Sequence, residues 1–175
     1  QFNGEEGFAD GAHGIHTADM DGDGDTDVLS ASVYNGRIGW HEHVVGPGGI
    51  EFVDHSITLT PPGAFSVTAA DMDNDGDLDV LSASSFVVAW HENVAAPGSG
   101  QLAFVTHTIT TDTGTTSRAL AADFDGDGDN DAVAVSGSLV TGITWYEQAG
   151  APCTGDLNGD GAVGGADLAI LLGQW

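Results

Sequence analysis

The most constraining feature of the sequence is an acidic segment that occurs three times at a constant interval. The segments ADMDGDGDTDVLSAS, ADMDNDGDLDVLSAS and ADFDGDGDNDAVAVS begin at Ala18, Ala70 and Ala122, so each copy starts 52 residues after the one before. Self-similarity at such a period is typical of stacked or radial repeats, in which each unit buries its apolar face only against its neighbours. The sequence therefore predicts three structural repeats.

Strands are expected throughout each copy. VLSAS alternates between apolar and small residues, and each copy then contains a run with a central tryptophan, at residues 38–42, 88–92 and 143–147. A run rich in β-branched residues follows at 52–58 and 104–110, and the third copy has no counterpart of it. A further short run precedes each acidic segment, and glycine and proline mark the turns between runs.

Four short strands in about 50 residues are typical of one blade of a β-propeller. We therefore expect an all-β fold with three tandem propeller-type blades, each a four-stranded antiparallel sheet. The repeats are expected at about residues 12–63, 64–115 and 116–148, within a repeat region over residues 1–150. The third blade is expected to be incomplete, and three blades are too few to close around an axis.

The acidic segments have the composition of calcium-binding loops. Residues 19–27 read DMDGDGDTD, so carboxylates stand at alternate positions. Ca²⁺ takes six to eight oxygens at about 2.3–2.6 Å, and alternate side chains reach one point only if the chain curls around it. We expect ligands from the side chains of the first, third, fifth and ninth residues and from the carbonyl of the seventh. These are Asp19, Asp21, Asp23, Asp25 and Asp27 in the first copy, Asp71, Asp73, Asp75, Asp77 and Asp79 in the second, and Asp123, Asp125, Asp127, Asp129 and Asp131 in the third.

The alternative is that aspartate and glycine only form soluble turns. However, fifteen of the 27 acidic residues fall into three nine-residue windows in register, and five close carboxylates repel one another unless a cation neutralises them. Hard oxygen ligands favour Ca²⁺ over zinc or copper, and Mg²⁺ retains its waters and requires a stricter octahedron. Asp54 lies outside these windows, so we expect Asp54→Ala to be nearly silent.

A different calcium loop is expected after Gln148. A linker of small residues leads into DLNGDGAVGGAD at residues 156–167, which fits the twelve-residue EF-hand loop, and apolar residues at helical spacing follow. We expect residues 151–175 to form a linker, a calcium loop and a short helix; the alternative is a polar linker before a helix. The candidate ligands of this fourth site are Asp156, Asn158, Asp160, Ala162 and Asp167.

The charge of the chain restricts its partners. Two arginines and no lysine oppose 27 acidic residues, which gives a formal net charge of −25, so neither nucleic acid nor an anionic membrane is an expected partner. Clustered carboxylates need divalent cations, and calcium is abundant outside cells. We therefore expect an extracellular or cell-surface protein whose signal peptide has been removed. Cys153 is the single cysteine, so no internal disulfide is expected.

Two resemblances follow from these motifs. The pattern D-x-D-x-D-G-x-x-D followed by a strand, repeated together with a tryptophan strand over residues 12–148, resembles the FG-GAP and VCBS repeats. That resemblance implies blades of calcium-bearing β-propellers, as in integrin α-subunits and secreted bacterial proteins. Residues 156–172 are similar to one half of a type I dockerin, which implies a calcium-dependent module that docks on cohesins or anchors secreted proteins.

The histidines and tryptophans each allow a functional and a structural interpretation. His41 suits a metal or catalytic site, but His91 repeats it in the second copy, as expected of a structural position within a blade. One tryptophan per copy either stacks against sugars or packs in the core, and we favour packing. These tryptophans are Trp40, Trp90 and Trp145.

Two classes of function remain. The first is a secreted calcium-binding structural or adhesive protein that self-associates into a ring or filament through open blade edges. The second is a carbohydrate-binding or carbohydrate-active accessory module of a larger secreted protein, anchored by the dockerin-like tail. Because no nucleophile motif and no glycine-rich phosphate loop is recognisable, we do not expect an enzyme. An extracellular protein or a glycan is a further expected partner.

Overall fold

The structure is a computed structural model that describes residues 11–59, 63–95, 101–111, 116–137 and 142–148. The tail, with its predicted EF-hand-like loop and helix, lies outside these residues. Within them every regular element is a β-strand, and the strands form three antiparallel sheets. The expected all-β fold of propeller-type blades is therefore confirmed for this part of the chain.

Each sheet follows the chain order, with every strand paired to the next. Sheet 1 contains β1 (Ala12–Ala18), β2 (Asp27–Ser32), β3 (Arg37–Gly46) and β4 (Gly49–Leu59). Sheet 2 contains β5 (Ser66–Ala70), β6 (Asp79–Ala83), β7 (Val88–Asn93) and β8 (Phe104–Thr110). Sheet 3 contains β9 (Thr116–Ala122), β10 (Asp131–Ser136) and β11 (Ile143–Tyr146).

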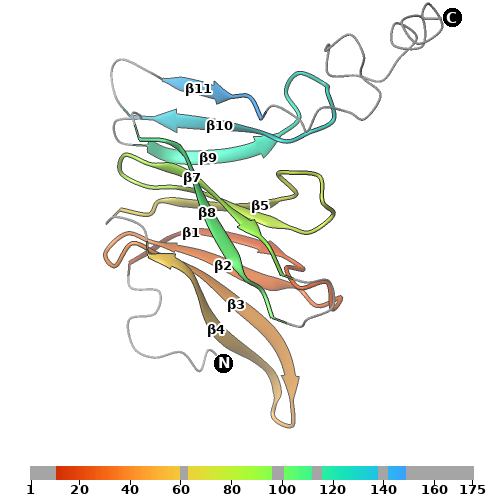
Figure 1. The fold of residues 1–175 in the computed structure, drawn as a ribbon. Coiled ribbons are helices and arrows are strands. Elements are labelled where there is room, and N and C mark those ends of the chain that lie inside the picture. The colour runs from red at the N-terminus through yellow and green to blue at the C-terminus, as the bar shows by residue number, and fades with distance from the viewer. Residues whose placement is uncertain (1–10, 60–62, 96–100, 112–115, 138–141, 149–175) are drawn as a thin grey trace, which may run out of the picture.

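The register of the first two sheets repeats residue for residue. Trp40 lies opposite His55 across β3 and β4, and Trp90 lies opposite His107 across β7 and β8. The strands of the third sheet pair in the same way, and Figure 1 shows the three sheets stacked one above another. Because side chains alternate across each strand, equivalent positions in the three copies point to equivalent sides of their sheets.

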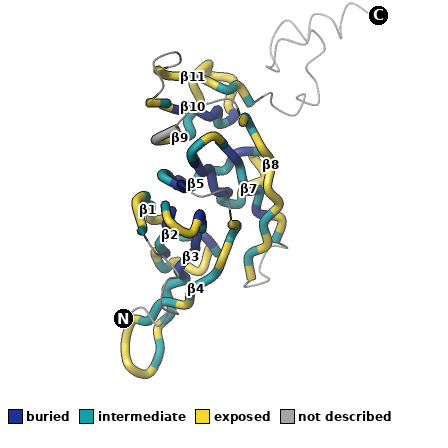
Figure 2. The backbone as a smooth tube through the Cα atoms, turned by 90° about the vertical axis from the view of Figure 1, so that its left-hand side faces the viewer, coloured by how far each residue is buried: buried dark blue, intermediate teal, exposed yellow. Residues whose placement is uncertain are grey.

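Apolar side chains fill the two spaces between the sheets. One cluster joins Leu29 and Trp40 of sheet 1 to Val67 and Val80 of sheet 2. The other joins the opposite face of sheet 2, including Leu81, to three alanines of sheet 3. Figure 2 shows the buried residues concentrated where the sheets face one another. Each repeat thus buries its apolar residues against the next repeat, as the sequence period predicts.

The outer part of sheet 1 extends beyond this core. β3 and β4 form a long hairpin (Figure 1), and Val45 and Ile50 near its turn are exposed. Among the described residues, the structure contains no helix of the length and apolarity that crossing a bilayer requires.

Candidate metal centre

Three acidic loops join the first strand of each sheet to the second. Acidic loop 1 (residues 19–27) follows β1, acidic loop 2 (71–79) follows β5, and acidic loop 3 (123–131) follows β9. Figure 1 shows them along one side of the stack. The strand pairing on both sides of each loop holds its ends together, so the fold itself closes the loop.

The backbone of these loops explains their sequence. The fourth and sixth residues of every loop have left-handed backbone, with φ between 61° and 101°. Glycine holds five of these six positions, and a Cβ there would meet nothing within 4 Å, so conformation rather than space selects glycine. The one exception is Asn74, the fourth residue of acidic loop 2, at φ 61°, and asparagine is one of the few side-chain-bearing residues that tolerate this region.

Alternate aspartates curl each loop through hydrogen bonds to its own backbone. In acidic loop 1 the N–H of Asp23 donates to Asp21 at 3.2 Å, and the N–H of Asp25 donates to Asp23 at 2.8 Å. The equivalent bonds occur in acidic loops 2 and 3. The N–H of Gly24 also donates to Asp19 at 3.0 Å. These bonds curl the chain around the carboxylates. The first, third and fifth residues converge in acidic loops 1 and 3, and the first, third and ninth converge in acidic loop 2.

Acidic loop 3 departs from the other two at its first residue. Asp71 accepts from the N–H of Gly76 at 3.1 Å, as Asp19 does from Gly24, whereas Asp123 accepts from the nearer Gly126 at 2.6 Å. The start of this loop is therefore more tightly wound.

The aspartate at the ninth position of each loop connects the loop to the tryptophan strand or to the residues that directly follow it. Both oxygens of the buried Asp27 carboxylate accept hydrogen bonds, from the N–H of Met20 at 3.1 Å, the indole of Trp40 at 2.9 Å and the N–H of His43 at 2.8 Å. Asp79 and Asp131 accept the equivalent backbone bonds. A rearrangement of the loop would therefore disturb the hydrogen bonds that its closing aspartate makes with the strands of the blade.

Each loop gathers three carboxylates within the span of one ion. One ligand oxygen from each residue lies within 4.8 Å of the others, and two oxygens on opposite sides of a Ca²⁺ ion are about 5 Å apart. The groups are Asp19, Asp21 and Asp23; Asp71, Asp73 and Asp79; and Asp123, Asp125 and Asp127. The structure therefore brings together nine of the predicted side-chain ligands.

Several carboxylate oxygens in these loops are buried without a partner. They are Oδ1 of Asp19, Oδ1 of Asp71 and both oxygens of Asp129. Asp129 is only 5% exposed, and burial, with the neighbouring Asp127, raises its pKa to about 6. Burial also raises the pKa values of Asp21 and Asp73. Buried carboxylates without donors are unfavourable, and a cation would relieve that cost, so these residues fit a hard cation.

Among the other predicted ligands, Asp75 is not part of the converging group of acidic loop 2, and Asp25, Asp77 and Asp129 were predicted to offer main-chain carbonyls and not carboxylates. The closing residues Asp27 and Asp131 use their carboxylates as clamps, and an oxygen that accepts one N–H still has a second lone pair. The predicted ligands of the tail, Asp156, Asn158, Asp160, Ala162 and Asp167, lie outside the described residues.

Two asparagines that the sequence analysis did not single out connect neighbouring loops. The side-chain amide of Asn74 in acidic loop 2 donates to the carbonyl of Gly128 in acidic loop 3 at 3.0 Å. The amide of Asn130 in acidic loop 3 donates to the carbonyl of Asp71 at 2.8 Å. A sequence signal was present for Asn74, because the other two copies have glycine at that position. The position of Asn130 differs in every copy and gave no such signal.

A serine, a histidine and an aspartate form a chain of hydrogen bonds across sheet 1. Ser30 Oγ lies 2.9 Å from His41 Nε2, and His41 Nδ1 lies 2.5 Å from Asp54 Oδ1. Although hydrolases use the same order, Ser30 is only 6% exposed and a nucleophile must reach its substrate. Sheet 2 repeats the arrangement with Thr106 as the last member. The structural interpretation of His41 therefore fits the geometry.

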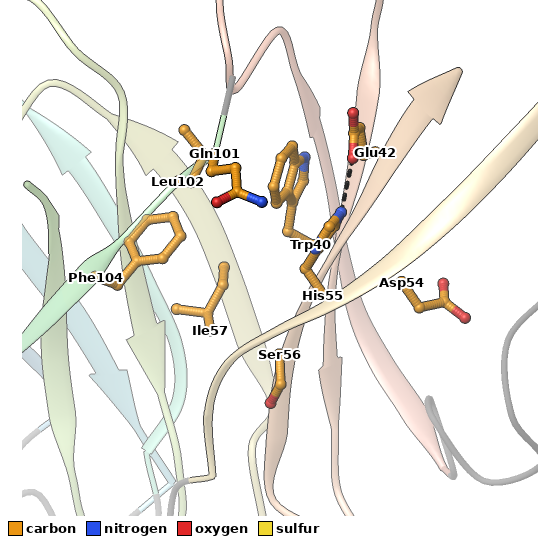
Figure 3. A pocket seen from close by; sticks show the side chains of 9 residues that line it. All are labelled: Trp40, Glu42, Asp54, His55, Ser56, Ile57, Gln101, Leu102 and Phe104. Atoms are coloured by element: carbon orange, nitrogen blue, oxygen red, sulfur yellow. Dashed lines mark hydrogen bonds and ion pairs between the residues drawn. The ribbon is translucent and has the colours of Figure 1, made fainter. Parts of the chain in front are cut away.

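A pocket of about 470 Å³ lies between the outer strands of sheet 1 and the segment before β8 (Figure 3). His55 stacks on Trp40 at 4.4 Å and lies 2.7 Å from Glu42. His107, Trp90 and Glu92 repeat this trio in sheet 2. A trio that recurs in both sheets is explained by blade packing, and His55 covers one face of the Trp40 ring.

The three tryptophans differ sharply in exposure. Trp40 is 2% exposed, Trp90 is partly buried in the core between sheets 2 and 3, and Trp145 is 48% exposed. The expected packing role holds for the first two. Trp145 has no following sheet among the described residues.

The comparisons agree with this architecture. Residues 19–82 match the model of the FG-GAP-like repeat, a span that begins at the first residue of acidic loop 1 and ends in β6. This part of the chain is thus a β-propeller-type module. The chain matches no curated protein.

Proposed function

We propose that each acidic loop binds one Ca²⁺ and that the chain is a non-catalytic, extracellular structural protein whose blades the ions stabilise. The observation that carries the proposal is the convergence of three carboxylates in each loop together with buried, unpartnered oxygens at Asp19, Asp71 and Asp129. Each loop supplies oxygen ligands only, which favours Ca²⁺ among the common metals.

The role of the ion follows from the position of the loop. Asp27 connects acidic loop 1 to Trp40 in the core, and the equivalent aspartates connect the other loops to their own strands. Without a cation, five carboxylates repel one another at the base of every sheet. Calcium would remove that repulsion and order the blade, and millimolar calcium outside cells suits such sites.

Thermal unfolding with and without calcium tests this proposal. A ligand at a hundredfold excess over its Kd stabilises a protein by about 2.7 kcal/mol per site, which for a chain of this size raises Tm by roughly 5–10 °C per site. We expect EGTA to lower Tm by at least one such step and added calcium to restore it. An identical Tm in both buffers would show that the loops are ordinary turns.

We further propose that the chain associates with copies of itself through the two ends of the stack. Ile15 on β1 is 73% exposed, whereas its counterpart Val67 on β5 is 5% exposed beneath sheet 1. At the other end Phe124, Ile143 and Trp145 are exposed, although Met20, Ile38 and Trp40 at the equivalent positions of sheet 1 are buried. The residues that join the sheets internally are thus open at both ends.

A second copy is the occupant that fits these ends. Inside the chain, the tryptophan side of one sheet is covered by the first strand of the following repeat. Stacking β1 of one molecule on the tryptophan side of sheet 3 of another would continue the same packing. The contact is head-to-tail, so it closes into a ring or grows into a filament.

Sedimentation with one aspartate at either end tests the association. Ile15→Asp and Ile143→Asp alter exposed residues and should leave the fold intact, and Val45→Asp on the β3–β4 hairpin is the control. We expect assemblies for the wild type and the control, monomers for each end variant, and dimers when the two end variants are mixed. A monomeric wild type at micromolar concentration with calcium would refute self-association.

A further inference from the structure

The two asparagine bridges distinguish one pair of acidic loops from the other. Between acidic loops 2 and 3, Asn74 donates to Gly128 and Asn130 donates to Asp71. Between acidic loops 1 and 2 the equivalent residues are Gly22 and Leu78, which carry no side-chain donor. Among the described residues, no hydrogen bond joins acidic loops 1 and 2. The two neighbouring pairs are therefore connected differently.

Each bridge begins and ends beside the candidate ligands. Asn74 lies between Asp73 and Asp75, and its acceptor Gly128 lies between Asp127 and Asp129. The acceptor of Asn130 is the main chain of Asp71, a candidate ligand itself. A loop that opens when its carboxylates repel one another would pull both bridges out of place in the neighbouring loop.

The buried carboxylate of acidic loop 3 lies at this connection. Asp129 stands between Gly128 and Asn130, the two residues that contact acidic loop 2, and both of its oxygens are buried without a partner. The equivalent Asp25 and Asp77 are only partly buried. Acidic loop 3 therefore has the stronger need for a cation at the place where it meets acidic loop 2.

We infer that Asn74 and Asn130 couple acidic loops 2 and 3, so that calcium binding in either loop strengthens binding in the other, whereas acidic loop 1 binds independently. This inference rests on the proposed calcium function. The physical basis is entropic: an ion that orders one loop fixes both bridges, and the second loop then loses less conformational freedom on binding. Long-range repulsion between loops opposes this effect, but the pair of loops 1 and 2 experiences it as well and serves as an internal reference.

The amides of Gly24, Gly76 and Gly128 provide one reporter for each loop. In ¹H–¹⁵N NMR spectra of the full chain, each signal should move with the occupancy of its own loop during a calcium titration. Asp73→Ala damages acidic loop 2, and Asp21→Ala is the matched lesion in acidic loop 1. We expect Asp73→Ala to raise the half-saturation concentration of Gly128 by on the order of tenfold and to leave Gly24 unchanged. Asp21→Ala should leave Gly128 unchanged.

Removal of the bridges completes the test. Asn74→Gly and Asn130→Thr introduce the residues that acidic loop 1 carries at the same positions, Gly22 and Thr26. Glycine adopts the left-handed backbone of position 74, at φ 61°, without strain. In this double variant, Asp73→Ala should no longer affect Gly128. An unchanged effect on Gly128, or equal effects on Gly24 and Gly128, would overturn the coupling while leaving calcium binding intact. Glycine signals that do not move with calcium at all would overturn the proposed function and the coupling together.

Discussion

Asp54 and Thr106 hold the same position in the first two sheets, and each lies within hydrogen-bond distance of a buried histidine. Asp54 lies 2.5 Å from His41, and Thr106 lies 2.9 Å from His91. The expectation that Asp54 can be replaced silently overlooked this contact. A partner that lies thirteen residues away on the neighbouring strand is fixed by the register of the sheet and not by the local sequence.

Replacement of Asp54 is now expected to destabilise the fold. Asp54→Ala leaves His41 without this buried acceptor, which costs about 1–3 kcal/mol in the free energy of unfolding. Asp54→Thr copies the arrangement of sheet 2 and should recover most of that loss. Urea denaturation of both variants measures the difference, and an Asp54→Ala chain as stable as the wild type would show the contact to be unimportant.

His91 makes blade stability sensitive to acid. Burial lowers its pKa to about 4, with a smaller contribution from His107, while the unfolded chain keeps the usual value near 6.5. Between these values the unfolded state binds more protons, so stability falls as the pH falls from about 6.5 to 4. The loss amounts to roughly 3 kcal/mol at pH 4.

His91→Gln should flatten this part of the profile, because glutamine can hydrogen bond to Ser82 and Thr106 without titrating. The measurement is the free energy of unfolding at several pH values with calcium held saturating. Parallel profiles for the wild type and the variant would contradict the role of His91.

At the scale of elements, the strands and loops were largely predictable because their signals are local. The alternation in VLSAS and the spacing of the aspartates lie within single copies, and the 52-residue period follows from a direct comparison of the copies along the sequence. The contacts between copies were not predictable in the same way. Asn74 and Gly128 are 54 residues apart, and Asn130 and Asp71 are 59 apart, so only the stacking of the sheets brings them together.

The hydrogen bonds of the closing aspartates to the tryptophan strand could not be predicted from the sequence either. Asp27 has the spacing of a calcium ligand, and the pattern alone assigns it to the ion. In the structure its carboxylate accepts from two backbone N–H groups and the Trp40 indole. One residue can therefore connect the loop with the core, which explains how ions at the edge of a sheet would stabilise its interior.

At the scale of the whole molecule, the described residues leave apolar side chains exposed at both ends of the stack. Ile15 at one end and Trp145 at the other stand where the internal junctions are closed. Three repeats thus form two complete contacts between sheets and leave one unpaired surface at each end. Because the repeats are alike, these two end surfaces correspond to the two sides of an internal contact. The proposed head-to-tail association would use the same kinds of surface that already pack against each other inside the chain.

The central claim is that the acidic loops are calcium sites, and isothermal titration of calcium into chelator-stripped protein tests it most directly. We expect at least three ions per chain, and a fourth if the tail also binds. A variant with Asp21→Ala, Asp73→Ala and Asp125→Ala, which removes one carboxylate from each loop, should lose three of them. Fewer than two ions per wild-type chain, or an unchanged count in the triple variant, would contradict the account.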